Sequence, residues 1–246
     1  MRSLAVFVAA LAVWLCTLHL CFGAEKAELV PRLAKGQLTA DPASLRRYNP
    51  EWELMARLFS ALAFANLSFE DPAWLPALQR LADETDALER QHGPTWFLLP
   101  YGAQAKQSLF VDGEIALMLA AKQLRVGGDA SALKDRVGRI ERQLNAAPLL
   151  LAESYPDEGW VFCNTVALAA LKVSDAALGT DHSELAARWV ASAKQHLVVP
   201  KTGLLVSSFH RGGAPRDGPE GSTLWLAAHM LQLVDPAFAS DQYALA

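Results

Sequence analysis

Three loops at predicted helix starts carry residue types that can transfer protons. The stretch Ser154–Leu171, SYPDEGWVFCNTVALAAL, brings a thiol, an amide and two carboxylates to the mouth of an apolar helix. Asp112–Glu114 precedes a second apolar helix, and Asp217–Ser222 lies in a loop rich in glycine and proline. A neutral thiol or carboxylic acid donates a proton and its ionised form accepts one, so these loops predict general acid–base chemistry.

Cys163 has two interpretations. It falls in the first turn of its helix, where the helix N-terminus lowers the pKa of a thiol, while Asp157 and Glu158 nearby favour the protonated thiol. It is therefore either a reactive group or a small side chain packed beside Val161 and Phe162. Asp157 is likewise either an acid of the site or a cap of the helix.

Glu114 is also open to two interpretations. An ionised carboxylate facing an apolar helix is costly, so Glu114 either points to solvent or lines a pocket with a raised pKa. Glu220 stands just before Ser222, which is a predicted helix N-cap. We take Cys163, Glu114, Asp157 and Glu220 as candidate catalytic residues. The candidate substrate-binding residues lie in or beside the same loops and are Ser154, Trp160, Asn164, Phe209, Ser222 and Trp225.

The sequence carries none of the motifs that hold a metal or a phosphate. It has no H-x-x-x-H or C-x-x-C pair, and the glycines of RVGGDAS follow a helix rather than a strand. A G-x-S-x-G nucleophile elbow is also missing. We therefore expect chemistry without a metal or other cofactor, carried by protein side chains alone.

The composition of the chain indicates how large a core it can bury and which partners it can bind. The chain has 246 residues, of which 52% are hydrophobic, so it can bury a sizeable core. Its net charge of -4 and pI near 5.9 leave no basic face, and nucleic-acid binding needs clustered lysine and arginine. We therefore expect no nucleic acid as a partner.

The N-terminus predicts a targeting segment. Residues 1–23 have one arginine followed by an apolar run from Leu4 to about Leu20, which is typical of a secretory signal. The run is also long enough for an uncleaved membrane anchor. We expect an exported protein, periplasmic or extracellular, or one anchored in the membrane through residues 4–20. Residues 24–50 are expected to form a polar linker.

From residue 51 onward, apolar residues recur at helical spacing. About seven helices follow, with a short extended segment at 202–210 and a loop at 211–222. Asp235-Pro236 is expected to end the last helix. The predicted helices cover residues 52–69, 73–91, 108–126, 129–147, 161–178, 179–197 and 222–234.

This pattern predicts an all-α domain, residues 51–246, built from consecutive helical hairpins. If the hairpins curl into a ring, the loops near 96–114, 154–164 and 209–222 gather at one end. A ring of six hairpins needs about twelve helices, roughly 300 residues at ordinary helix and loop lengths. We therefore expect a toroid-like array that is open or incomplete in this chain.

Residues 105–243 resemble the linalool dehydratase/isomerase family. The resemblance rests on a combination of short motifs, each weak alone. These are Pro156-Asp157, Cys163-Asn164-Thr165, Gly179-Thr180-Asp181, Trp189, Pro200, Phe209-His210 and Asp235-Pro236-Ala237-Phe238.

The resemblance implies an (α/α)6 toroid with an apolar central pocket, in a cyclic homo-oligomer. It implies cofactor-free dehydration and isomerisation of a tertiary allylic alcohol by cysteines, a histidine and an Asp/Tyr pair. The second family cysteine matches Cys163, whereas the first falls on Ser154 and the histidine on Glu114. The Asp/Tyr pair has no match, so the fold transfers better than the reaction.

Three functions remain open from the sequence. The first is a lyase or isomerase acting on an apolar, terpenoid-like alcohol. The second is a non-catalytic helical module, tethered to a membrane or free. The third is a carbohydrate-active enzyme, for which two carboxyl groups about 5–10 Å apart across an open cleft would be needed.

Overall fold

The computed structural model describes residues 2–22 and 26–246, and it gives side-chain surroundings for residues 4–17 and from 32 onward. The chain divides into two compact units, Met1–Ala40 and Asp41–Ala246. The first contains α1 (Arg2–Phe22) and α2 (Lys26–Thr39). The predicted apolar run at 4–20 lies within α1, and residue 23, the last of the predicted targeting segment, lies outside the described residues.

Residues 24–50 differ from the polar linker that we expected. Most of this stretch is helical, comprising α2, the 3-10 helix η1 (Pro42–Arg47) and the start of α3 (Pro50–Leu67). Asp41 begins η1 by accepting a hydrogen bond from the Ala43 N–H at 3.0 Å, and Pro42 sets the first helical backbone angle. The second unit therefore begins about ten residues before the predicted domain.

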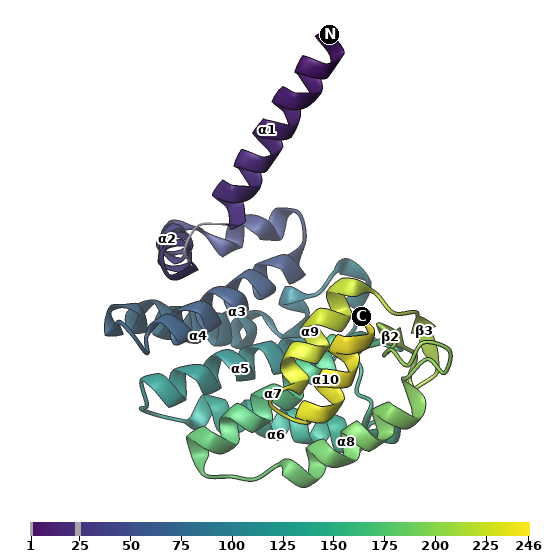
Figure 1. Cartoon of the computed structure of the whole chain (residues 1–246). Helices are drawn as coiled ribbons and strands as arrows, with labels where there is room; N and C mark the ends of the chain where they lie inside the picture. The colour runs from purple at the N-terminus through teal and green to yellow at the C-terminus, as the bar shows by residue number, and fades with distance from the viewer. Residues whose placement is uncertain (1, 23–25) are drawn as a thin grey trace. The chain divides into compact units, whose positions relative to one another are not determined.

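The second unit is all-α, as predicted (Figure 1). Its remaining α-helices are α4 (Leu75–His92), α5 (Leu109–Arg125), α6 (Ser131–Ala146), α7 (Val161–Leu178), α8 (Ser183–His196), α9 (Gly221–Leu231) and α10 (Pro236–Leu245). Four further 3-10 helices connect them, namely η2 (Pro72–Trp74), η3 (Pro94–Phe97), η4 (Pro100–Gly102) and η5 (Pro148–Leu150). The predicted helices near 52–69, 73–91, 108–126, 129–147, 161–178, 179–197 and 222–234 correspond to α3 through α9.

The prediction at Asp235-Pro236 was wrong, because this pair starts α10 instead of merely ending α9. The Asp235 carboxylate accepts a hydrogen bond from the Phe238 N–H at 3.0 Å, which is the N-cap geometry. Proline at the first helical position lacks only an N–H that would have no intrahelical acceptor there. α9 has already ended at Leu231, so the dipeptide begins a further helix.

A small antiparallel sheet closes the loops at one end of these helices. Its strands are β1 (Gly159–Trp160), β2 (Ser208–Phe209) and β3 (Pro215–Asp217), in the order β1-β2-β3. Gly159 pairs with Phe209 and Trp160 with Ser208. β2 lies between the other two strands, so it links the loop of the first chemical motif, on β1, to that of the third, on β3.

α3, α5, α7 and α9 pack in succession, and α4, α6 and α10 pack on α3, α5 and α9 respectively. The tightest approach is between α5 and α7, where a Cβ on Gly113 would stand 3.2 Å from Ala167 Cα. Glycine permits this approach because it has no side chain. α7 is the one described helix long and apolar enough to cross a membrane, but 61% of it is buried in the fold, so it serves as a core helix.

One buried ion cluster ties three helices together beneath this core. Arg136 of α6 is fully buried and hydrogen-bonds Asp86 and Glu89 of α4 and Asp112 of α5. Burial opposes the charge on Arg136, but the carboxylates of Asp112 and Glu89 outweigh it and raise the pKa of the guanidinium. Gln143 donates to the second Asp112 oxygen at 2.7 Å, so the cluster is closely satisfied.

Candidate proton-transfer site

Glu114 is buried in the first half of α5 and is 1% exposed. Neither carboxyl oxygen has a hydrogen-bond partner. Burial raises the pKa of this carboxyl well above its ordinary value, and the negative charge of Glu51 raises it further. Glu114 is therefore buried rather than turned to solvent, and burial favours its neutral form.

Cys163 lies in the first turn of α7 and is 2% exposed. Burial raises the pKa of its thiol, Glu114 and Glu51 add to the rise, and a hydrogen bond with Ser154 acts in the opposite direction. The depression of the pKa expected at a helix N-terminus is therefore outweighed by burial. Burial therefore favours the protonated form of both candidate groups, which suits a site that donates protons.

The close packing of α5 on α7 explains why these two groups meet. Gly113 contacts Ala167, and Cys163 stands one helical turn before Ala167 on the same face of α7. Glu114 follows Gly113 directly. An ionised Glu114 would raise the pKa of the Cys163 thiol, so the two groups lie within electrostatic range of each other between α5 and α7.

Ser154 positions the loop above the pair. It is 1% exposed, its N–H donates to the Glu158 carbonyl at 2.8 Å, and its own carbonyl accepts from the Ser108 hydroxyl at 2.7 Å. Ser108 is also the N-cap of α5. Ser108 thus both caps α5 and holds the backbone of Ser154. This keeps the Ser154 hydroxyl in hydrogen-bond contact with the Cys163 thiol.

A second acid, which the sequence analysis did not select, lies next to this pair. The Tyr155 hydroxyl donates to the Glu51 carboxylate and accepts from the Leu99 N–H at 2.9 Å. Burial raises the pKa of Glu51 and of Tyr155, and the Glu51 hydrogen bond raises that of Tyr155 further. The ring of Tyr101 stacks on Tyr155 at 4.4 Å between centroids. An acid–tyrosine pair therefore borders Glu114 and Cys163.

Glu158 joins the outer edge of this group. Its carboxylate accepts from the Trp160 indole N–H at 2.5 Å and from the Tyr101 hydroxyl at 3.5 Å, and it forms an ion pair with Arg216. Burial, followed by the charge of Glu158, raises the pKa of Tyr101 to about 12. Trp160, one of the candidate substrate-binding residues, holds Glu158 with its indole N–H.

Asn164 and Phe209, both predicted to bind substrate, are framework residues. The Asn164 amide donates to the carbonyls of Ala152 and Trp160 at 3.0 Å each, and its oxygen accepts from the Trp189 indole at 3.1 Å. Phe209 is fully buried, and a Cβ on Gly159 would stand 2.1 Å from its ring. Each therefore fixes the loop that carries Ser154.

The other predicted residues lie at the surface. Asp157 has a left-handed backbone with φ of 59° and accepts from the Arg211 N–H at 3.2 Å, so it joins two loops and does not cap α7. Glu220 and Ser222 are exposed at the start of α9, and Trp225 is 50% exposed. Glu220, not Ser222, is the N-cap, without a side-chain cap bond. These four side chains face solvent and are separate from the buried Glu114 and Cys163.

The residues that the structure describes contain no group of three or more His, Cys, Asp or Glu side chains suited to a metal ion. No protein-family model matches the chain. The chemistry of the site is therefore derived from its own side chains. The candidate site consists of Glu114, Cys163 and Ser154, together with the hydrogen-bonded pair Glu51 and Tyr155.

Proposed function

We propose that this chain is a cofactor-independent acid–base lyase or isomerase acting on an apolar, terpenoid-like alcohol. The observation that carries the proposal is Glu114, a fully buried carboxyl group whose two oxygens lack partners. An unpartnered buried polar group is costly and is retained where a bound ligand or a reaction uses it. A substrate hydroxyl would satisfy it.

Protonation of a hydroxyl converts it into water, a better leaving group, and removal of a neighbouring proton completes dehydration. In our proposal the neutral Glu114 gives its proton to the hydroxyl, and the ionised carboxylate then accepts one from carbon. Cys163 serves as the second proton carrier, oriented by Ser154. Glu51 and Tyr155 exchange protons with the pair. A buried, apolar setting strengthens such transfers because competing water is excluded.

The fold part of the proposal concerns the helix order. The succession α3, α5, α7, α9, each followed by a partner helix, agrees with four hairpins of an (α/α)6 toroid-like array. The resemblance to the linalool dehydratase/isomerase family supports the same arrangement and suggests a homo-oligomer. The secretory signal or membrane anchor at 1–23 remains part of the proposal, with a periplasmic or extracellular location.

Turnover of tertiary allylic alcohols by the purified chain tests the reaction. We expect alkene or rearranged alcohol as product, and a loss of at least about 100-fold in kcat for Glu114→Gln and Cys163→Ala, the scale of general acid–base catalysis. Gas chromatography of the products measures it, and Glu70→Gln and Cys16→Ala, which alter exposed groups, serve as matched controls.

Two outcomes would contradict the proposal. One is full turnover in folded Glu114→Gln or Cys163→Ala protein. The other is that the well-folded wild-type chain converts none of the tertiary allylic alcohols tested. That result would favour a non-catalytic helical module.

A further inference from the structure

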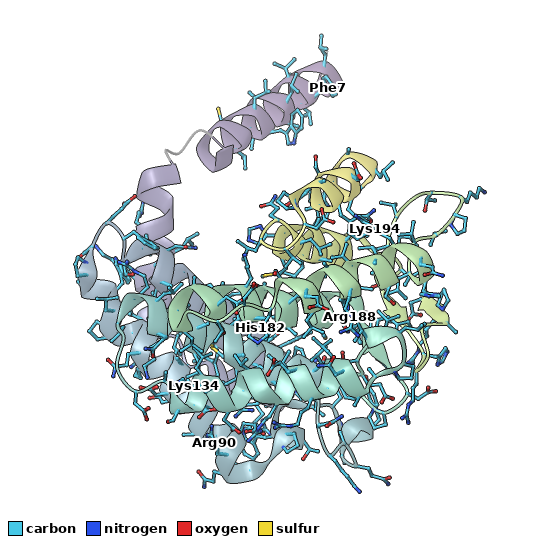
Figure 2. The ribbon with its side chains drawn as sticks, turned by 90° about the horizontal axis from the view of Figure 1, so that it is seen from below. Phe7, Arg90, Lys134, His182, Arg188 and Lys194 are labelled. Atoms are coloured by element: carbon cyan, nitrogen blue, oxygen red, sulfur yellow. The ribbon has the colours of Figure 1, made fainter. Side chains whose placement is uncertain are left out.

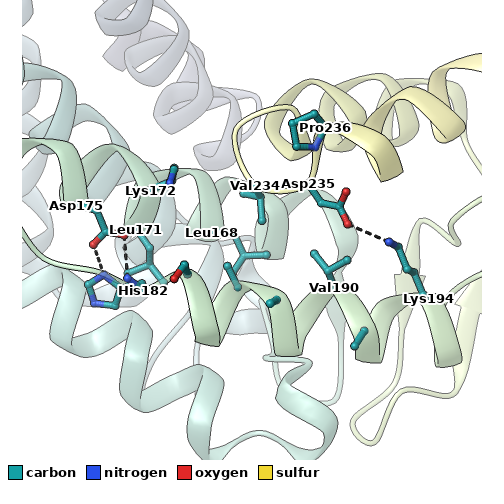
Figure 3. Close-up of a pocket in the computed structure, with 14 residues that line it drawn as sticks. Leu168, Leu171, Lys172, Asp175, His182, Val190, Lys194, Val234, Asp235 and Pro236 are labelled. Atoms are coloured by element: carbon teal, nitrogen blue, oxygen red, sulfur yellow. Dashed lines mark hydrogen bonds and ion pairs between the residues drawn. The ribbon is translucent and has the colours of Figure 1, made fainter.

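A groove of about 430 Å³ lies between α7 and α8 and is roofed by the turn from α9 to α10 (Figure 3). α3 packs on α4 and α5 on α6, whereas α7 and α8 stand further apart. Small-molecule sites typically occupy roughly 300–1,000 Å³, so the groove has the volume of a ligand site. Neither Glu114 nor Cys163 lines it.

The floor and roof of the groove are apolar. α7 supplies Leu168 and Leu171, and the α9–α10 turn supplies Val234 and Pro236. The α8 wall is made of small side chains, which leave the space between the helices open; these are Ala186, Ala187, Val190 and Ala191. Such a lining favours a hydrocarbon chain, because burying apolar surface stabilises by about 25 cal/mol per Å².

The two acids of the groove are already occupied by donors of the protein. Asp175 accepts from the Thr180 hydroxyl at 2.8 Å and from the N–H and the ring of His182 at 2.9 and 2.5 Å. Asp235 accepts from Lys194 at 2.9 Å and caps α10. His182 precedes the first turn of α8 and Lys194 lies in its last turn, so these two clusters mark the ends of the groove (Figures 2 and 3).

Lys172 is the third basic residue that lines the groove, and unlike His182 and Lys194 it is not hydrogen-bonded to any acid that the structure describes. It is exposed and forms no hydrogen bond or ion pair with any residue in the described part of the chain. Leu168 stands one helical turn before it on the same face of α7. Its electrostatic influence reaches Asp181, whose pKa is lowered first by hydrogen bonds and further by the charge of Lys172. An ammonium group without a bonded acid among the described residues therefore adjoins the apolar floor, which is the arrangement that suits an anionic head with a hydrocarbon tail.

We propose that this groove binds a medium-chain carboxylate. The carboxylate pairs with Lys172, and the chain lies over Leu168 and Leu171 beneath Val234, with the α8 alanines on its other side. The site is independent of the proposed proton-transfer reaction, since it shares no residue with it.

Calorimetric titration of the full chain with decanoate at neutral pH tests this site. We expect saturable 1:1 binding that is roughly threefold to fivefold tighter than for decyltrimethylammonium, the scale of a partly exposed ion pair. Lys172→Glu should reverse that preference. Ala187→Trp, which fills the groove from an exposed position, should abolish binding, whereas Lys201→Gln on the surface outside the groove should leave it unchanged.

Three results would overturn the proposal. These are no saturable binding of decanoate to wild-type protein, equal binding of both amphiphiles, or undiminished binding to folded Ala187→Trp. Circular dichroism of each variant verifies folding, so that a loss of binding cannot come from unfolding.

Discussion

The free energy of unfolding should fall as the pH rises above the unfolded pKa of a glutamic acid toward the raised pKa of folded Glu114, and Glu114→Gln should remove most of this fall. In the unfolded chain a glutamic acid ionises above about pH 4.3, whereas in the folded chain burial and then the charge of Glu51 raise the pKa of Glu114 well above this. Above the unfolded pKa the folded state binds one proton more, so stability decreases with rising pH. The loss continues until the folded pKa is reached.

The expected size is about 1.4 kcal/mol for each pH unit in that window. Denaturant unfolding of wild type and Glu114→Gln at several pH values measures it, and the difference between the two proteins cancels most other titrations. Glu70→Gln, an exposed change, should follow the wild-type curve. Parallel curves for wild type and Glu114→Gln would show that Glu114 is ionised in the fold.

Replacing Arg136 should destabilise the fold more than any other single charge removal in the helix core. Arg136→Met leaves Asp86, Glu89 and Asp112 buried with their principal counter-ion gone. Breaking a buried ion cluster from one side typically costs about 3–5 kcal/mol. Burial already raises the pKa of Asp112, so the variant should recover part of its loss at low pH, where that carboxyl is neutral.

Lys122→Met is the matched control for Arg136→Met. Lys122 pairs with Asp83, whose side chain is 45% exposed, and such surface pairs contribute about 0–1 kcal/mol. Urea unfolding of both variants gives the comparison. Equal destabilisation by the two substitutions would contradict the assignment of Arg136 as the centre of the cluster.

Helical periodicity predicted α3 through α9 because their apolar faces repeat at three and four residues. It missed α10, since Asp235-Pro236 signals both a stop and a start, and only the packing of Phe238 against the fold decides between them. It also treated α2 as linker, because few apolar residues distinguish that helix.

The candidate site was predictable in part. Asp-Gly-Glu before an apolar helix pointed to Glu114, and a thiol at a helix start pointed to Cys163. Whether the Glu114 and Cys163 side chains are buried distinguishes the alternatives that the sequence left open. Their burial depends on the packing of α5 against α7 rather than on local sequence. Glu51 resembles an ordinary first-turn acid of α3, and nothing in its neighbourhood predicts its bond to Tyr155, 104 residues away.

The protonation state of Glu114 beside the Cys163 thiol tests the central claim most directly. Infrared difference spectra of wild type against Glu114→Gln at pH 7 should show the carbonyl band of a protonated carboxylic acid without hydrogen bonds. The S–H band assigned by Cys163→Ala should shift in Glu114→Gln, because the two groups adjoin. A carboxylate band in place of the acid band, or an unshifted S–H band, would contradict the buried pair as the site of proton transfer.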